Sequence, residues 1–328
     1  MAEIGVLGAG SWGTALAISI CNSGNDVVIW SRNEGLVDSI NHDRVNSYLP
    51  DIVLPEKIHA TNSVNDVTNC KTILMVVPAQ TIRENCESLK NAGISNEISL
   101  VLCCKGIEKG SQKLMGEVVK EVLPDNPLAI LSGPNFAYEV AKGLPSCTTI
   151  ACEDNNLGLK LLEQIGSPAF RTYLTSDVIG AQIGGAVKNV LAIACGIAIG
   201  KGLGENTRAA IVTRGIAEIK RLCMAKGGKA ETLMGLSGIG DIMLTCGSKT
   251  SRNMSFGYNM GQGKTVEELT GSGQKLAEGV VTSSSVSELA KSLDVEMPIC
   301  NAVNEIIFNG SDIDTVISGL LSRPLTFE

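Results

Sequence analysis

The first half of the chain alternates between short apolar runs and longer segments of mixed polarity. The apolar runs lie at residues 3–8, 26–30, 72–78, 98–104, 128–132 and 147–151. Segments with a helical pattern lie between most of them, at residues 12–23, 80–91 and 111–122. Strands that are apolar throughout and alternate with helices are typical of a parallel sheet covered on both faces. The pattern therefore predicts an α/β fold with a doubly wound, Rossmann-like and mostly parallel sheet.

The pattern changes near residue 176, beyond which successive helices replace the strands. These helices are expected at residues 178–199, 206–226, 253–261, 278–291 and 299–308. A chain of 328 residues is long enough for two domains. We therefore predict a sheet domain over residues 1–176 and an all-α domain over residues 177–328.

Charge and cysteine content exclude several kinds of partner. The net charge of −7 argues against nucleic acids and anionic membranes, which select basic surfaces. Eleven cysteines without any CxxC pair favour reduced thiols in a cytosolic protein over disulfides or a metal site, so we expect no metal. The chain opens directly on an apolar run without a basic segment before it, and a cytoplasmic protein is expected.

The sequence GVLGAGSWG places Gly8, Gly10 and Gly13 between the first predicted strand and the first predicted helix. In this context the GxGxxG spacing indicates a dinucleotide-binding loop. The first glycine permits a tight turn, the second lets a pyrophosphate approach the backbone, and the third lets helix and strand pack closely. The amides of Ser11 and Trp12 would bind the same anion at the helix N-terminus. The alternative is a glycine-rich turn without a ligand.

Arg32 follows the second predicted strand, where an acidic residue would bind the adenosine ribose of NAD. A guanidinium suits a 2′-phosphate, so NADP(H) is favoured and NAD(H) remains possible. The alternative is that Arg32 is an ordinary solvated side chain and that both cofactors bind.

Polar residues also follow two further predicted strands. Lys105 ends the run at 98–104, and Gly133, Asn135 and Ala137 follow the run at 128–132. Ligands of doubly wound sheets bind outside the carboxyl ends of the strands. These residues are therefore candidate ligand contacts, although lysines and Ser-Gly-Pro turns at strand ends are common without any ligand.

Residues 184–200, GGAVKNVLAIACGIAIG, contain one lysine, Lys188, in an otherwise apolar run. The run has nearly the length of a membrane span, but Lys188 and Asn189 at its centre favour a buried helix over stable membrane insertion. The helical neighbours of Lys188 on its own face are all small: Ala181, Gly184, Gly185, Ala192 and Cys195. Such a stripe leaves room for a ligand or another backbone to approach the amine.

The chemistry favoured for Lys188 is that of a general acid/base. Burial and neighbouring cations lower the pKa of a lysine by up to roughly 3–5 units, which brings proton exchange close to neutral pH. The chain has only two histidines, His42 and His59, in a stretch that is typical of a loop. The alternative is a structural lysine whose stem reaches the surface.

Two further groups lie in the second half. Ser251, Arg252 and Asn253 are consecutive before a helical segment, and together they suit a phosphate. Capping alone explains Ser251 or Asn253 but does not explain Arg252. Asp241 is isolated in an apolar stretch. It either orients Lys188, accepts hydrogen bonds from substrate hydroxyls, or simply caps a helix after Gly240.

These motifs together closely resemble those of the bacterial-type NAD(P)-dependent glycerol-3-phosphate dehydrogenases. The resemblance is carried by GAGSWGTALA at 8–17, KG at 105–106, SGPNFA at 132–137, GGAVKN at 184–189, GLSGIGD at 235–241, SRN at 251–253, EGV at 278–280 and VEMPI at 295–299. It covers nearly the whole chain in the family's order. Asn135 stands where the family often has threonine, and Leu276 replaces a smaller apolar residue.

The resemblance implies reversible reduction of dihydroxyacetone phosphate to sn-glycerol 3-phosphate, the backbone precursor of phospholipids, and a homodimer is expected. It implies that Lys188 is the proton donor and acceptor. The implied substrate contacts are Lys105, Gly133, Asn135, Lys188, Asp241, Ser251, Arg252 and Asn253. The implied cofactor contacts beside the glycine loop are Ser11, Trp12, Arg32, Lys105, Ala137, Arg252, Leu276 and Glu278.

Two other functions remain open at this point. A related dehydrogenase of a hydroxyacid or sugar acid would use the same cations for a carboxylate. A non-catalytic NADP-binding sensor would need the glycine loop but not Lys188, Asp241 and Arg252 together.

Overall fold

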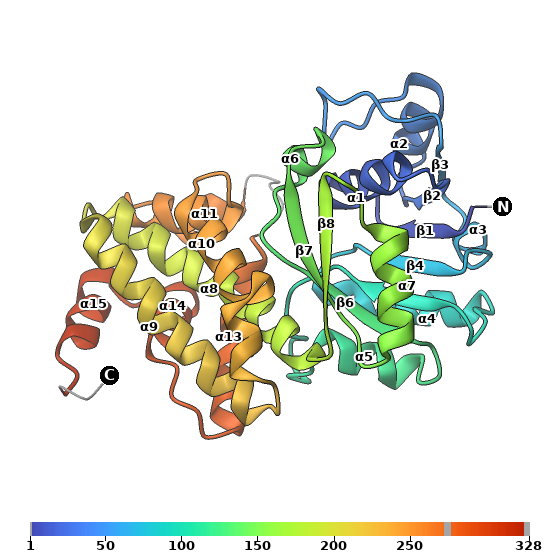
Figure 1. Ribbon diagram of the computed structural model, residues 1–328. Helices are drawn as coiled ribbons and strands as arrows, with labels where there is room; N and C mark the ends of the chain where they lie inside the picture. Colours follow the sequence, from blue (N-terminus) through green and yellow to red (C-terminus); the bar gives the residue numbers. More distant parts are fainter. Residues whose placement is uncertain (1, 272–276, 325–328) are drawn as a thin grey trace. The chain divides into compact units, whose positions relative to one another are not determined.

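The computed structural model describes residues 2–271 and 277–324, in two compact units (Figure 1). The first unit comprises the residues up to 105 together with residues 113–182. The second comprises residues 106–112 and the chain from residue 183 onward. The continuous helix α8, Val178–Gly200, carries the chain from one unit to the other.

The first unit is built on one eight-stranded sheet with the order β3-β2-β1-β4-β5-β6-β7-β8. Neighbouring strands are parallel, except that β6 and β7 are antiparallel. The predicted doubly wound, mostly parallel sheet is confirmed. The strands are β1 Ile4–Leu7, β2 Val27–Trp30, β3 Ile58–Thr61, β4 Thr72–Met75, β5 Ser99–Leu102, β6 Leu128–Ser132, β7 Ser146–Ala151 and β8 Phe170–Thr175.

Helices cover both faces of this sheet. Alternate residues of β1 enter different cores: Ile4 and Val6 pack into one, and Leu7 packs into the other. Successive side chains of a strand point to opposite faces, so a strand that is apolar throughout requires two cores. The helices of this unit are α1 Ser11–Asn22, α2 Glu34–Asp38, α3 Val64–Val67, α4 Ile82–Asn91, α5 Met115–Val122, α6 Ala137–Ala141 and α7 Asn155–Ile165.

The sequence pattern missed the two edge strands, β3 and β8. Both carry polar residues and are only half-buried, because an edge strand need not be apolar on both faces. The expectation that both histidines lie in a loop is wrong. His59 is in β3, and His42 is in a π-helical turn at Ser39–Asp43.

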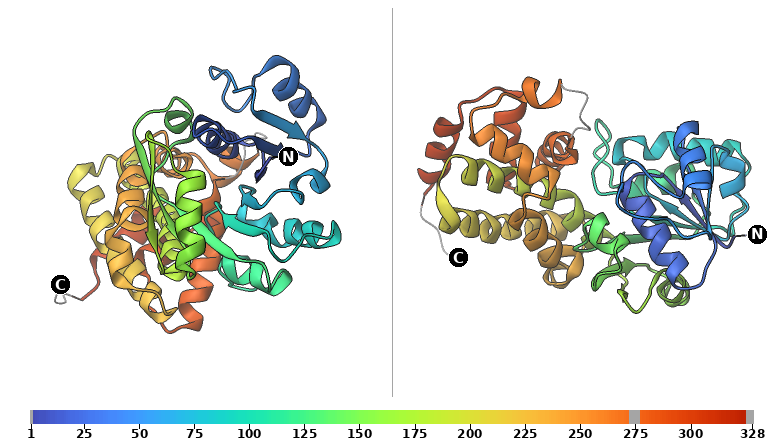
Figure 2. Two further views of the ribbon diagram at one scale, coloured as in Figure 1. Left: turned by 45° about the vertical axis from the view of Figure 1, so that its right-hand side comes forward. Right: turned by 90° about the horizontal axis from the view of Figure 1, so that it is seen from above.

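In the part of the second unit that the structure describes, every helix or strand element is a helix (Figures 1 and 2). Besides α8 its helices are α9 Gly204–Ala225, α10 Asp241–Gly247, α11 Arg252–Gly261, α12 Val266–Thr270, α13 Glu278–Ser292, α14 Pro298–Phe308 and α15 Ile313–Leu321. Glycines bring the backbones of α8 and α11 together. A Cβ atom on Gly196 would lie 2.2 Å from the Met254 carbonyl oxygen, and one on Gly257 would lie 2.1 Å from that of Ile193.

Helix α8 is long and apolar enough to cross a membrane, but 89% of its most apolar window is buried inside the protein. The prediction of a buried helix is therefore confirmed. All eleven cysteines are free thiols, as expected. Burial raises the pKa of Cys21 and of Cys86 to about 12, so these thiols stay protonated and pack as small apolar side chains.

Candidate functional site

The glycine loop between β1 and α1 has the backbone that its sequence predicts. Gly8 has a φ of +123°, a backbone conformation that residues with a side chain rarely adopt. A Cβ atom there would lie 2.6 Å from the Val76 carbonyl oxygen. A Cβ atom on Gly13 would lie 1.9 Å from the Gly8 carbonyl oxygen, so helix and loop touch through their backbones. A Cβ atom on Gly10 would meet nothing within 4 Å. Packing therefore explains two of the three glycines and leaves Gly10 to the approach of a ligand.

The N-terminus of α1 is suited to an anion. Its N-cap residue is Gly10, which offers no side chain to the first amides, and its first turn contains no acidic residue. The positive end of a helix dipole and its amides then favour a phosphate. Ser11 is exposed, whereas the Trp12 ring packs edge-on against Phe170 with ring centroids 6.4 Å apart. These residues fit the pyrophosphate of a dinucleotide.

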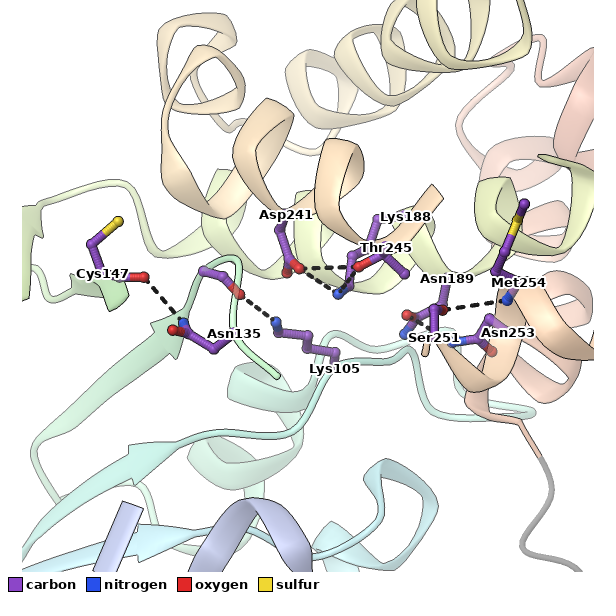
Figure 3. A network of polar contacts seen from close by, with 11 residues as sticks. Lys105, Asn135, Cys147, Lys188, Asn189, Asp241, Thr245, Ser251, Asn253 and Met254 are labelled. Atoms are coloured by element: carbon purple, nitrogen blue, oxygen red, sulfur yellow. Dashed lines mark hydrogen bonds and ion pairs between the residues drawn. The ribbon is translucent and has the colours of Figure 1, made fainter. Parts of the chain in front are cut away.

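Polar side chains gather where β5 and β6 end (Figure 3). The Lys105 Nζ donates to the Gly133 carbonyl oxygen at 3.1 Å. The Asn135 Nδ2 donates to the Cys147 carbonyl oxygen at 3.1 Å, while its Oδ1 is buried without a hydrogen-bond partner. Lys105 and the Gly133 turn are therefore in contact at the carboxyl ends of β5 and β6. Ala137 begins α6 just beyond them.

Two hydroxyls beside the Gly133 turn are also buried without partners, those of Ser132 and Thr148. A Cβ atom on Gly133 would lie 2.8 Å from the Thr148 Cα, so the turn is pressed against β7. Each buried polar atom without a partner costs about 1–3 kcal/mol. An Asn135 oxygen and two hydroxyls in this condition indicate a place that a polar ligand would satisfy.

In the second unit, Lys188 is buried in an ion pair (Figure 3). Its Nζ lies 2.5 Å from Asp241 Oδ1 and 2.7 Å from Thr245 Oγ1. Thr245 Oγ1 also donates to Asp241 Oδ1 at 3.3 Å. Lys188 is 7% exposed and Asp241 is 1% exposed. A buried charge is tolerated when it is paired and hydrogen-bonded, so Asp241 is what allows the lysine to lie inside the apolar run.

The chain brings Asp241 to Lys188 through glycines. The π-helical turn Leu236–Gly240 precedes α10 and contains a non-helical residue, Gly238. A Cβ atom on Gly184, one turn before Lys188 on α8, would lie 2.6 Å from the Ser237 carbonyl oxygen. The predicted stripe of small residues therefore admits another backbone. Asp241 does not cap the helix, because α10 begins at Asp241 with Gly240 as its N-cap.

Burial and neighbouring cations lower the pKa of a lysine, and the sequence offered Asp241 as a residue that orients Lys188 without indicating a buried ion pair between them. The carboxylate of Asp241 acts in the opposite sense and favours the ammonium. The sequence pattern did not single out Thr245, which follows Asp241 by four residues and therefore lies on the same face of α10. That spacing was a signal present in the sequence.

Asn253 joins three helices of the second unit. Its Nδ2 donates to Asn189 Oδ1 on α8 at 3.0 Å, and its Oδ1 accepts from the Gly279 amide on α13 at 2.9 Å. Glu278 is the first residue of α13. The motifs KN, SRN and EGV therefore meet, although the sequence did not show that Asn189 takes part.

The residues on either side of Asn253 differ in exposure. Ser251 is the buried N-cap of α11, and its Oγ accepts from the Met254 amide at 3.3 Å. Arg252 is exposed at the N-terminus of α11, and Arg32 is exposed after β2. Leu276 lies outside the described residues.

A dinucleotide loop on a parallel sheet, followed by helices that bury a lysine–carboxylate pair, defines the class of nicotinamide-dependent dehydrogenases that act on small molecules. The N-terminal family model of NAD-dependent glycerol-3-phosphate dehydrogenase matches residues 3–158, and the C-terminal model matches residues 177–318. The chain belongs to the NAD-dependent glycerol-3-phosphate dehydrogenase family.

Individual relatives agree over the whole chain. The chain is 47% identical to glycerol-3-phosphate dehydrogenase (NAD(P)+) of Maricaulis maris, covering 99% of this chain and 98% of the relative. It is 48% identical to the enzyme of the same name from Erythrobacter litoralis, covering 100% and 98%. The crystal structure of glycerol-3-phosphate dehydrogenase from Coxiella burnetii matches with a TM-score of 0.94 and 38% identity, covering 98% of this chain and 99% of that one.

Proposed function

We propose that the chain catalyses the reversible reduction of dihydroxyacetone phosphate to sn-glycerol 3-phosphate, with NADPH as the preferred reductant, and so supplies phospholipid synthesis. The observation that carries this proposal is the buried Lys188, held by Asp241 and Thr245 in a chain of this family.

Lys188 is the proposed proton donor. The carboxylate of Asp241 keeps it as an ammonium, which is the form that donates a proton to the C2 oxygen of the ketone. A nicotinamide cofactor held at the glycine loop would supply the hydride that C2 takes up, which would give the alcohol and the oxidised cofactor. In the reverse direction the same amine takes the proton from the alcohol. A positioned acid/base of this kind contributes typically 10²–10⁴-fold to the rate.

The proposed substrate contacts fall into two groups of residues, one around the N-terminus of α11 and one that follows β5 and β6. Arg252 would bind the phosphate with a guanidinium fork, beside Ser251 at the N-terminus of α11. Asn253 already makes two hydrogen bonds, so it would use its remaining amide hydrogen. Lys105, Gly133 and Asn135 form the other group of substrate contacts, and the unpartnered Oδ1 of Asn135 supports this role.

The proposed cofactor contacts are the glycine loop with Ser11 and Trp12, and further Arg32, Lys105, Ala137, Arg252, Leu276 and Glu278. An exposed Arg32 directly after β2 supports a preference for NADP(H) over NAD(H). Titration of both reduced cofactors into the wild type and Arg32→Ala tests this preference. We expect only NADPH affinity to fall in the variant, and equal losses for both cofactors would contradict the role.

Three further expectations stay predictions. They are a boundary between the domains at residue 176, a homodimer in solution and a cytoplasmic location. Eleven free thiols support a reducing compartment. Size-exclusion chromatography with light scattering measures the oligomeric state.

The decisive experiment is NADPH consumption, followed at 340 nm, on addition of dihydroxyacetone phosphate. Dihydroxyacetone without the phosphate, a set of 2-keto acids and the keto forms of a set of sugar acids are the controls. We expect turnover with the phosphorylated ketone only. Turnover with a keto acid or a sugar acid alone would favour the hydroxyacid or sugar-acid alternative. NADPH binding without any turnover would favour a sensor.

A further inference from the structure

A fully buried asparagine lies behind the glycine loop. Asn46 is 0% exposed and belongs to residues 44–54, between β2 and β3, to which the function described above assigns no role. We propose that Asn46 is a positioning residue for the cofactor, acting through the backbone of the glycine loop. The inference rests on the proposed function in one respect, that the dinucleotide binds at this loop.

The side chain of Asn46 bridges the loop and the first turn of α1. Its Nδ2 donates to the Ala9 carbonyl oxygen at 3.1 Å and to Thr14 Oγ1 at 2.7 Å. Its Oδ1 accepts from the Tyr48 amide at 2.9 Å. Both ends of the amide are therefore committed, and the orientation that puts Nδ2 toward Ala9 is the one that the Tyr48 amide requires.

The contact with Ala9 fixes the direction of the next amide. Ala9 lies between Gly8 and Gly10, and its carbonyl belongs to the same planar peptide as the Gly10 N–H. In a trans peptide these two groups point in opposite directions. Holding the carbonyl toward Asn46 therefore aims the Gly10 N–H away from it. Glycines make such a loop soft, and this hydrogen bond removes that freedom before an anion arrives.

Asn46 is itself held in place. The segment that carries it closes on itself, since the Leu54 amide donates to the Arg44 carbonyl oxygen at 2.9 Å. The Leu49 amide donates to the Asn46 carbonyl oxygen at 2.8 Å, and the Leu49 and Ile52 side chains are buried in the core that α1 also joins. Compact loops closed in this way are frequently functional. Two main-chain hydrogen bonds and two buried apolar side chains therefore hold the segment that carries Asn46.

Only a side chain with a donor and an acceptor at this length makes these bonds. In Asn46→Asp, an oxygen would face the Ala9 carbonyl oxygen and repel it, and a negative charge would lie behind a site for an anion. In Asn46→Ala, the Ala9 carbonyl would be released without the charge. The two variants therefore separate positioning from electrostatics.

The chain offers a matched control. Asn126, in the same unit, is 1% exposed, and its Nδ2 donates to the carbonyl oxygens of Ser95 and Ile98 at 2.9 Å each. It has the same chemistry as Asn46 but no contact with the glycine loop. Asn126→Ala measures what the loss of such a buried amide does to stability alone.

The experiment measures the Kd of NADPH by fluorescence and the Tm of the full chain. We expect Asn46→Ala to raise the Kd about tenfold, the equivalent of one lost hydrogen bond. Asn46→Asp should raise it further and recover in part at low pH, where the protonated carboxyl regains a donor. Asn126→Ala should lower the Tm by a similar amount with an unchanged Kd. In Asn46→Ala, kcat at saturating NADPH should stay within about twofold of the wild type.

A Kd within twofold of the wild type in both Asn46 variants would overturn the inference, as would an equal rise in Asn126→Ala. If Asn46→Ala does not fold, the isosteric Asn46→Asp decides by the same criteria. Failure of the wild type to bind NADPH would instead overturn the proposed function, so the two failures are distinguishable.

Discussion

The two units hold their functional polar groups in different ways. In the sheet unit most of these polar groups belong to the main chain. The loop at Gly8–Gly13 offers amides, and the carbonyls of Ala9 and Gly133 accept hydrogen bonds from side chains. In the helical unit side chains bind one another, as Lys188 does with Asp241 and Thr245. A site made of main chain follows from a local sequence. A site made of side chains depends on helices that are far apart in the chain.

The same difference decides how each site fails. A glycine has no side chain to truncate, so the glycine loop is disrupted by a substitution that adds a Cβ atom. The lysine site is damaged by removing one partner, because the remaining charge stays buried without compensation. We therefore expect an added side-chain atom to damage the glycine loop and the removal of a side chain to damage the site of Lys188.

The largest effect is expected for Lys188→Ala. Loss of the proton donor should lower kcat by at least the ~10²-fold typical of a general acid, with NADPH affinity unchanged. Steady-state kinetics with NADPH and dihydroxyacetone phosphate measure this. Lys201→Ala, which changes the partly exposed partner of Asp314 just after α8, is the control. Near-normal turnover in Lys188→Ala would reject the role.

Gly13→Ala should damage the other site. The added Cβ would overlap the Gly8 carbonyl oxygen, and overpacking of this kind costs about 1–3 kcal/mol. We expect the Kd of NADPH to rise about tenfold or more and the Tm to fall, with both followed by titration and thermal melting. Gly35→Ala, where a Cβ atom meets only the Asn33 side chain at 3.4 Å, should bind normally. Normal NADPH binding by Gly13→Ala would show that the loop is not the dinucleotide site.

Thr245→Val tests how far the function of Lys188 depends on the hydroxyl of Thr245. The change keeps the shape of the side chain and removes two hydrogen bonds to charged groups, one from Lys188 and one to Asp241. Each is worth about 1.5–3 kcal/mol. We expect kcat to fall about tenfold, less than in Lys188→Ala, with little change in the KM for either substrate. Thr245→Ser should restore most of it. If Thr245→Ser is as slow as Thr245→Val, the methyl group and not the hydroxyl is what matters.

The smallest effect concerns Glu218 on α9, a buried carboxylate of the helical unit that accepts hydrogen bonds from main-chain amides. It is buried and accepts from the Ile299 amide at 2.7 Å and the Cys300 amide at 3.2 Å, at the N-terminus of α14. Burial raises the pKa of Glu218 above its ordinary value of 4.5, although the two amides and Arg221 act in the other direction. The protonated carboxyl is therefore favoured by folding.

For a raised pKa, the stability contribution is complete below pH 4.5 and is lost as pH rises through the folded value. Glu218→Gln imitates the protonated form at every pH. We expect its Tm, relative to the wild type, to improve from pH 4.5 toward pH 8. The exposed Glu288→Gln is the control. A Tm difference that is constant with pH would contradict the direction of the shift.

Much of the fold follows from local pattern alone. The central strands are apolar runs because both of their faces are buried, and every one of them lies where the pattern places it. The edge strands β3 and β8 do not follow from the pattern, because a strand with one neighbour and a wet face has no continuous apolar signal.

The sequence by itself determined the glycine loop, the buried helix around Lys188 and the placement of Lys105 and Gly133 after two predicted strands. Each depends on a short stretch or on the shared edge of a parallel sheet. Only the tertiary structure decided that Asp241 pairs with Lys188, that Asn189 and Asn253 meet, and that Asn46 holds the loop from behind. The partners in those contacts are many residues apart. Residue spacing fixes geometry within one element, but the packing of distant elements comes from the whole fold.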